Sequence, residues 1–275
     1  MIFVVGGKGF VGSAIVRYLE SHKIKYKIIQ RENKDAFFGK KCSILIYANG
    51  NPYRYKADED PYFDFMASLE STAEYVHKIK YKKFVLISTV GVYGIYLNKT
   101  TATYETTKES DEIDEDELDN YGYHKLLAEN YVKHFCKDYL IFRLPAIVGK
   151  GLKKNQAYDF IHKNKKVMVS KNSSINFINT DFAAKTIFKI IKLNIKDEIF
   201  NIASENNIKI KNLKKILGFD SEYSDDSEKN VLTYYINVEK IKRYVKLSRS
   251  EDAILEYYKS LTNKSRILTK KSEVI

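Results

Sequence analysis

The chain has 275 residues, 44% of them apolar, which is enough to bury the core of one large domain or of one domain with a smaller lobe. Its net charge is +12, but only seven of the 47 basic residues are arginines and the lysines are scattered, which argues against nucleic-acid binding. The sequence has no apolar run long enough to span a membrane, and its two cysteines stand outside any zinc-binding pattern. We therefore expect a cytoplasmic protein without a metal site.

The first half of the chain alternates short apolar runs with helical patterns, which is typical of βαβ units and a parallel sheet. The predicted strands cover 2–5, 26–29, 43–47, 84–87 and 139–143, and the predicted helices cover 11–21, 63–78 and 121–135. This alternation predicts an α/β fold with a doubly wound parallel sheet that is nearly complete by residue 150.

The regular alternation of predicted strands and helices ends near residue 150. Predicted helices at 181–192 and 210–217 are separated by loop-rich stretches at 150–176 and 218–232, which suggests a smaller C-terminal lobe. Residues 263–275 are polar and basic, and we expect them to form a flexible tail.

A glycine-rich segment follows the first predicted strand. Gly6, Gly9 and Gly12 stand between this strand and an apolar helix. Glycine is needed where the chain turns tightly and its backbone approaches a pyrophosphate, and the following helix N-terminus offers N–H donors. In this context the segment predicts a dinucleotide-binding loop.

A second set of residues points to proton transfer. Ser88 and Thr89 end a predicted strand, at the edge where parallel sheets bind ligands. Tyr121 and Lys125 are four residues apart, hence on one face of a predicted helix. A nearby ammonium would lower the pKa of the tyrosine, which would let the phenol exchange a proton with a carbonyl or an alcohol.

These residues together resemble the extended short-chain dehydrogenase/reductases, particularly the nucleotide-sugar epimerases, reductases and dehydratases. The resemblance covers nearly the whole chain. It rests on the following motifs: Gly6-x-x-Gly9-x-x-Gly12, Ala48-Asn-Gly50, Ser88-Thr-Val-Gly-Val-Tyr-Gly94, Tyr121-x-x-x-Lys125, Arg143-Leu-Pro-Ala-Ile-Val-Gly149 and Asn176-Phe-Ile-Asn-Thr-Asp181.

The resemblance implies a Rossmann-type NAD(P)-binding domain over 1–150, to which 177–203 return, and a substrate lobe over 151–176 and 204–262. It implies that Thr89, Tyr121 and Lys125 are catalytic. The expected cofactor contacts are Gly6, Gly9, Phe10, Val11, Gly12, Gln30, Arg31, Ala48, Asn49, Gly50, Tyr121, Lys125 and Pro145. The expected substrate contacts are Ser88, Thr89, Tyr93, Asn155 and Asn176.

Departures from the family pattern narrow the chemistry. Family dehydratases carry an Asp-Glu pair where this chain has Val90-Gly91, so elimination of water is disfavoured. Epimerisation and keto reduction of a nucleotide-sugar both remain, and the lysines at 150, 153 and 154 favour a diphosphate. A reductase of a small ketone and a non-catalytic dinucleotide sensor are the alternatives. Homodimers are common in the family, so a homodimer is possible here, but the sequence leaves the oligomeric state open.

The cofactor is predicted to be NADP rather than NAD. NAD-binding members of such folds end the second strand with an acidic residue, which binds the adenosine ribose. Here Gln30 and Arg31 follow that strand, and a guanidinium can bind a 2′-phosphate. Glu32 comes next and would serve NAD if the strand ended later.

Overall fold

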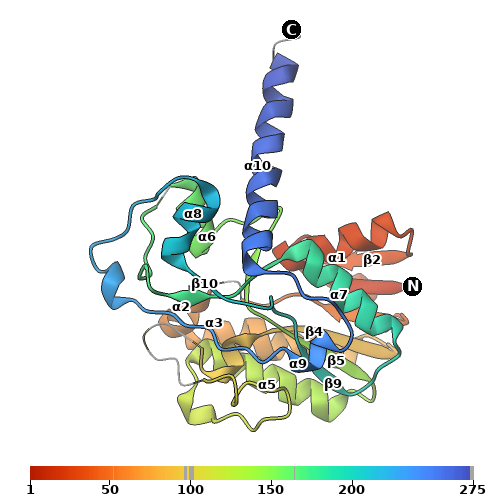
Figure 1. Ribbon diagram of the computed structural model, residues 1–275. Coiled ribbons are helices and arrows are strands. Elements are labelled where there is room, and N and C mark those ends of the chain that lie inside the picture. The colour runs from red at the N-terminus through yellow and green to blue at the C-terminus, as the bar shows by residue number, and fades with distance from the viewer. Residues whose placement is uncertain (52, 96–97, 99–101, 164, 273–275) are drawn as a thin grey trace.

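Six parallel strands form the central sheet in the computed structural model, which describes residues 1–51, 53–95, 98, 102–163 and 165–272, with side chains through residue 262 (Figure 1). The strands are β1 (Ile2–Val5), β2 (Tyr26–Ile29), β3 (Ile44–Tyr47), β4 (Lys83–Thr89), β5 (Tyr139–Leu144) and β9 (Glu198–Asn201). Their spatial order is β2-β1-β3-β4-β5-β9, and every neighbouring pair is parallel. These strands are mostly apolar because the sheet is covered on both faces.

Helices cover the two faces of this sheet. On one face lie α1 (Phe10–Ser21) and α7 (Thr180–Lys192), and on the other lie α3 (Pro61–Phe65), η2 (Met66–Glu70), α4 (Ser71–Lys78) and α5 (Asn120–Phe135). Alternate residues of β1 enter different cores: Val4 packs with the α1 side, whereas Phe3 packs with the α4 side. This arrangement confirms the predicted doubly wound α/β fold.

Two chain segments outside the sheet build a smaller lobe. In it β7 (Ser174–Ile175) pairs antiparallel with β10 (Ile208–Lys209). Next to it β6 (Ala146–Val148) pairs in parallel with β8 (Phe177–Asn179), outside the expected lobe bounds of 151–176 and 204–262. The lobe also contains α6 (Gln156–His162), α8 (Leu213–Leu217) and two 3₁₀ turns, η5 (Ile210–Asn212) and η6 (Ser227–Lys229).

Several elements were not predicted from the sequence. They are strand β9 of the central sheet, α2 (Arg54–Glu59), α6, α9 (Glu239–Lys242), α10 (Ser250–Ser272), the strands of the small sheets, η6 and three further 3₁₀ turns, η1 (Arg31–Phe37), η3 (Val90–Tyr93) and η4 (Glu115–Glu117). Helix α10 packs through Ile254 and Tyr257 and then stands out from the body (Figure 1). Its backbone continues to Ser272 within the expected flexible tail, and residues 273–275 lie outside the described residues.

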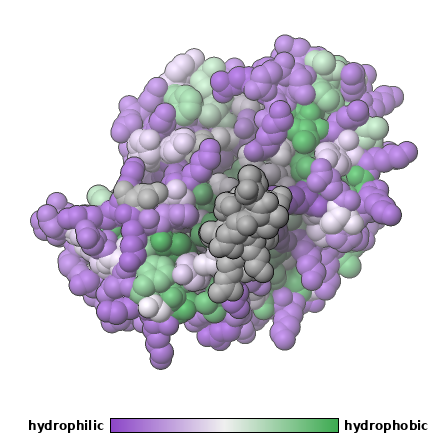
Figure 2. Space-filling model, turned by 90° about the horizontal axis from the view of Figure 1, so that it is seen from above, coloured by the Kyte–Doolittle hydropathy of each residue, from purple (hydrophilic) through white to green (hydrophobic). Residues whose placement is uncertain are grey.

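Hydrophilic side chains dominate the surface around α10 (Figure 2), with small hydrophobic patches between them. Across the residues that the structure describes, no helix combines the length and the apolar character needed to cross a membrane. The same residues contain no group of three or more His, Cys, Asp or Glu side chains that would hold a metal ion.

Candidate active site

The turn between β1 and α1 forms a cradle that only glycine allows. Gly6 has a φ of +73°, and a Cβ there would lie 2.7 Å from the carbonyl oxygen of Ala48. A Cβ on Gly12 would overlap the carbonyl of Gly6, so the helix starts directly against the turn. Gly9 is the N-cap residue, and Phe10 and Val11 are the first helical residues. The backbone around the helix start is therefore open to a pyrophosphate.

A cleft of about 620 Å³ extends from this cradle. Its walls come from the carboxyl ends of β1, β2 and β3 and from the segment α3 to α4. The lining includes five of the predicted cofactor residues, namely Gly6, Gln30, Arg31, Asn49 and Gly50. Ala48 abuts the turn, and Pro145 is buried directly after β5.

The end of β2 presents an amide and a guanidinium to this cleft. With its amide oxygen turned toward the glycine-rich turn, Gln30 accepts hydrogen bonds from the backbone N–H groups of Gly7 and Lys8 at 3.1 and 3.0 Å. Arg31 and Glu32 are exposed at the start of η1 and line the same cleft. The sequence predicted that Gln30, Arg31 and Glu32 follow the second strand next to the cofactor. It did not indicate that Gln30 bonds to the glycine-rich turn.

Helix α5 carries Tyr121 and Lys125 on the face that points into the protein. The amino group of Lys125 lies 5.7 Å from the centre of the Tyr121 ring and abuts Gly50 at the cleft wall. A Cβ on Gly122 would lie 2.7 Å from the carbonyl oxygen of Gly91, so the first turn of α5 touches the loop after β4. The structure thus brings together the helix, the cleft and the end of β4, which carries Thr89.

Arg54 also reaches this site, and the sequence analysis did not single it out. Its guanidinium carbon lies 5.6 Å from the centre of the Tyr121 ring, and its Nε donates a hydrogen bond to Asp119 at 2.5 Å. Asp119 ends an acidic stretch of the chain and caps α5 by accepting from the N–H of Gly122. No local pattern marks Arg54, because α2 has a polar sequence in which Ala57 alone is buried.

The pKa of Tyr121 moves in the direction opposite to our expectation. Burial raises it to about 12, and the positive charge of Arg54 opposes this rise. The negative charges of Asp64 and Asp119 raise it further, as does the neighbouring phenol of Tyr234. The lobe residue Tyr234 is thus a second phenol beside the site, and the sequence offers no signal that separates it from the other 21 tyrosines.

A buried acidic group faces Lys125. Burial lowers the pKa of Lys125, while the charges of Asp64 and Glu129 oppose this effect. Asp64 is completely buried, accepts a hydrogen bond from Asn51 at 2.8 Å, and lies 2.8 Å from Nδ1 of His124. His124 lies on α5, one residue before Lys125, and is buried against Asp64.

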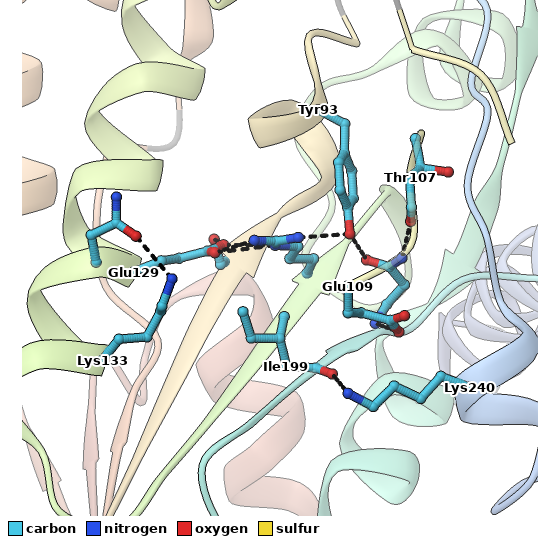
Figure 3. A network of polar contacts seen from close by, with 11 residues as sticks. Tyr93, Thr107, Glu109, Glu129, Lys133, Ile199 and Lys240 are labelled. Carbon is cyan, nitrogen blue, oxygen red and sulfur yellow. Dashed lines mark hydrogen bonds and ion pairs between the residues drawn. The ribbon is translucent and has the colours of Figure 1, made fainter. Parts of the chain in front are cut away.

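Predicted substrate residues near β4 have different surroundings. Thr89 accepts a hydrogen bond from the N–H of Gly91 at 3.0 Å, whereas Ser88 is buried and donates to Glu129 at 2.5 Å. Tyr93 is also buried, and its hydroxyl donates to Asn201 at 3.0 Å (Figure 3). The side chain of Thr89 thus bonds within the loop that contacts α5, and the substrate roles of all three residues stay predictions.

The two predicted asparagines brace the lobe. Asn155 caps α6 by accepting from Tyr158 at 2.9 Å and donates to the carbonyl of Ile147. Asn176 is buried and bonds to backbone groups of Ser204 and Asn206. These contacts occupy both amides within the protein, and their expected contact with substrate stays a prediction.

A model of the NAD dependent epimerase/dehydratase family matches residues 48–203, which is more than half of the chain. The chain belongs to this family. A search of curated proteins found no match. Among solved structures, a UDP-galactose 4-epimerase is similar with a TM-score of 0.77 and 19% identity, over 96% of this chain and 99% of that one. A Bacillus cereus UDP-glucuronic acid 4-epimerase variant, in complex with a UDP-sugar and NAD, has a TM-score of 0.74 and 17% identity, over 95% and 99%.

Membership of the NAD dependent epimerase/dehydratase family confirms two expectations, the resemblance to the extended short-chain dehydrogenase/reductases and the assignment as an NAD(P)-dependent enzyme. A UDP-N-acetylglucosamine 4-epimerase from Methanobrevibacter ruminantium M1 shares the same fold, with a TM-score of 0.75 and 16% identity, over 96% and 98%. The individual site residues rest on geometry alone.

Proposed function

We propose that the protein is an NAD(P)-dependent epimerase or reductase of a sugar linked to a nucleoside diphosphate. The observation that carries this proposal is the convergence of Tyr121 and Lys125 with the end of β4 at the wall of the dinucleotide cleft. Solved structures of the same fold are described as enzymes of UDP-sugars, some of them with NAD. These descriptions support a nucleotide-sugar as the substrate class.

The residues present fit a dinucleotide. The glycine cradle has no room for a Cβ at Gly12, and the cleft runs from it to Gly50, against which Lys125 lies. We assign the pyrophosphate to the start of α1 and the ribose next to the nicotinamide to Lys125. When bound, the nicotinamide accepts or returns a hydride.

Tyr121 is assigned the proton transfer. When the sugar is oxidised, the phenolate oxygen of Tyr121 takes the proton of a sugar hydroxyl, and it returns this proton when a carbonyl is reduced. Thr89 already accepts a hydrogen bond from Gly91, and a hydroxyl that accepts can still donate its own proton. We assign that donated hydrogen bond to the substrate oxygen. Lysines 150, 153 and 154, ahead of α6, are assigned to the diphosphate.

Replacing Tyr121 by phenylalanine tests this function. Tyr121→Phe removes the hydroxyl and keeps the ring, so turnover of UDP-sugars should fall by about 10²- to 10⁴-fold while cofactor affinity stays nearly unchanged. Tyr123→Phe is the matched control, because Tyr123 is an exposed tyrosine on the same helix. The measurement is turnover of a panel of UDP-sugars with each nicotinamide cofactor, alongside cofactor binding.

Two outcomes would contradict the proposal. Most of the wild-type rate in Tyr121→Phe would remove the acid/base assignment. Faster turnover of a small ketone than of any nucleotide-sugar would favour the small-ketone reductase instead.

We also propose NADP as the preferred cofactor. Arg31 is an exposed guanidinium at the cleft, at the point where β2 ends and the adenosine ribose of such folds lies. No carboxylate occupies position 30 or 31, and Glu32 is the competing partner for NAD.

A further inference from the structure

Arg54 joins three parts of the active site. At the first residue of α2, its Nε donates to Asp119 at 2.5 Å and its Nη1 donates to the carbonyl of Ile95 at 2.8 Å. Asp119 accepts from the N–H of Gly122 at 2.9 Å and thereby caps the helix that carries Tyr121. The guanidinium therefore fixes the loop after β3, the loop after β4 and the first turn of α5 relative to one another.

Two cationic side chains lie at nearly equal distances from the Tyr121 ring. The ring centre is 5.6 Å from the guanidinium carbon of Arg54 and 5.7 Å from the amino nitrogen of Lys125. Distance alone does not distinguish the two cations, but their surroundings do. Lys125 abuts Gly50 on the cofactor side, whereas Arg54 is held at the first turn of α5 by its ion pair.

The two cations also differ in how firmly they keep their protons. Burial lowers the pKa of Lys125. Burial acts in the same direction on Arg54, but the hydrogen bond and charge of Asp119 outweigh it, so the pKa of Arg54 is raised. Arg54 is therefore positively charged at every pH at which the enzyme works.

The acidic groups around Tyr121 oppose its ionisation. Asp64 from α3 and Asp119 from the loop before α5 raise the pKa of Tyr121, and Tyr234 from the lobe acts in the same direction. The positive charge of Arg54 lowers this pKa. A phenolate at position 121 is thus stabilised by the guanidinium that also holds its helix.

We propose that Arg54 is a positioning residue for Tyr121, which fixes the first turn of α5 and stabilises the phenolate with its charge. This inference rests on the proposed function, because it assigns a partner to the proton-transferring tyrosine. In sugar oxidation the hydroxyl O–H bond and the adjacent C–H bond break as the C=O bond forms. The proton goes to Tyr121, the hydride with its electron pair goes to the oxidised nicotinamide cofactor, and Arg54 keeps its protons throughout.

The pH dependence of kcat/KM for sugar oxidation tests this role. Activity rises with pH as the base form of Tyr121 appears, so a higher pKa moves the rising limb to higher pH. Arg54→Met should shift this limb upward by about one pH unit or more, because an opposite charge within about 6 Å is lost. Arg54→Lys keeps the charge and should leave the limb close to that of the wild type.

Asp119→Asn supplies the opposite shift. The amide oxygen of an asparagine can still cap α5, but the negative charge is gone, so the limb should move to lower pH. Lys56→Met is the matched control: it removes one positive charge from the same helix, where the ammonium lies over the rings of Tyr53 and Phe63. Its limb should match that of the wild type.

The outcomes separate the inference from the proposed function. A wild-type rate in Tyr121→Phe would overturn the proposed function. Suppose instead that Tyr121→Phe is inactive. The role of Arg54 alone would then be overturned if the rising limb of the pH profile were unchanged in Arg54→Met and Asp119→Asn, or if both variants shifted it in the same direction. Circular dichroism checks that each variant is folded. If Arg54→Met does not fold, the downward shift of Asp119→Asn with a retained limb in Arg54→Lys decides the question.

Discussion

The cofactor choice depends on neighbouring residues of opposite charge at the end of β2. Arg31 and Glu32 are both exposed and both line the cleft. A 2′-phosphate pairs with the guanidinium, whereas the two ribose hydroxyls of NAD pair with the carboxylate. Lys34 is already paired with Glu74 at 2.7 Å, so Arg31 is the cation that we assign to the phosphate.

A titration of the two reduced cofactors measures this choice. NADPH should bind the wild type more tightly than NADH does, and Arg31→Ala should lose that advantage because the bidentate phosphate contact is gone. Glu32→Ala is the matched variant and should weaken NADH binding more than NADPH binding. A wild-type preference for NADH would reverse the assignment.

Elements with an apolar period could be predicted from the sequence, and elements without one could not. The predicted strand at 2–5 coincides with β1, because all four of its residues are buried and each residue of a buried parallel strand is selected for packing. Helix α2 escaped prediction because its six residues are almost all polar, and the tertiary contacts of Arg54 and Ala57 hold it in place. The candidate residues Tyr121 and Lys125 could be proposed from the sequence because they are four residues apart on one predicted helix. Arg54 and Tyr234 could not, because only the tertiary structure brings them to Tyr121.

A buried ion pair connects α5 to the sheet. Arg143 of β5 donates to Glu129 of α5 at 2.6 Å, and both side chains are almost fully buried. Arg143 also donates to the hydroxyl of Tyr93, which donates in turn to Asn201 of β9 (Figure 3). The chain of contacts continues to Thr107, whose carbonyl accepts from Asn201. The helix that carries Tyr121 is thereby bonded directly to β5 and is linked to β9 through Tyr93.

Removing one partner of this pair should strongly destabilise the protein. Glu129→Leu leaves the Arg143 guanidinium buried without its carboxylate, so the free energy of unfolding should fall by about 3–5 kcal/mol. The double variant Glu129→Leu with Arg143→Met should lose less, because no unpaired charge remains buried. Lys229→Met, which removes an exposed ion pair with Asp226, is the control and should cost less than about 1 kcal/mol. Urea unfolding measures all three; equal costs for Glu129→Leu and Lys229→Met would contradict the argument.

At the scale of the whole molecule, Asn201 joins the sheet to the lobe, because it stands at the end of β9 and donates to the carbonyl of Asn237. Asn176 joins the two proposed lobe segments, 151–176 and 204–262, because it donates to the carbonyl of Ser204. We propose that these segments respond to a ligand bound between lobe and sheet. A homodimer stays a prediction.

Hydrogen exchange should reveal this response. Addition of a nucleoside diphosphate such as UDP should slow amide exchange in 151–176 and 204–262, and the sheet strands should change less because their amides are already bonded. A nucleotide-free ketone is the control ligand and should give little protection. Protection by the ketone without a response to UDP would contradict a nucleotide-sugar substrate.

The order of strands has a consequence for biosynthesis. The partner of β5 on its outer side is β9, which lies more than fifty residues later in the chain. A nascent chain that has emerged only to residue 150 already contains five strands, but one edge of its sheet is a bare apolar strand able to pair with another chain. In such a chain Tyr93, which accepts a hydrogen bond from Arg143, also lacks Asn201, to which its hydroxyl donates in the finished protein. The outer edge of β5 is therefore covered by β9 only after the first lobe segment and α7 have been synthesised.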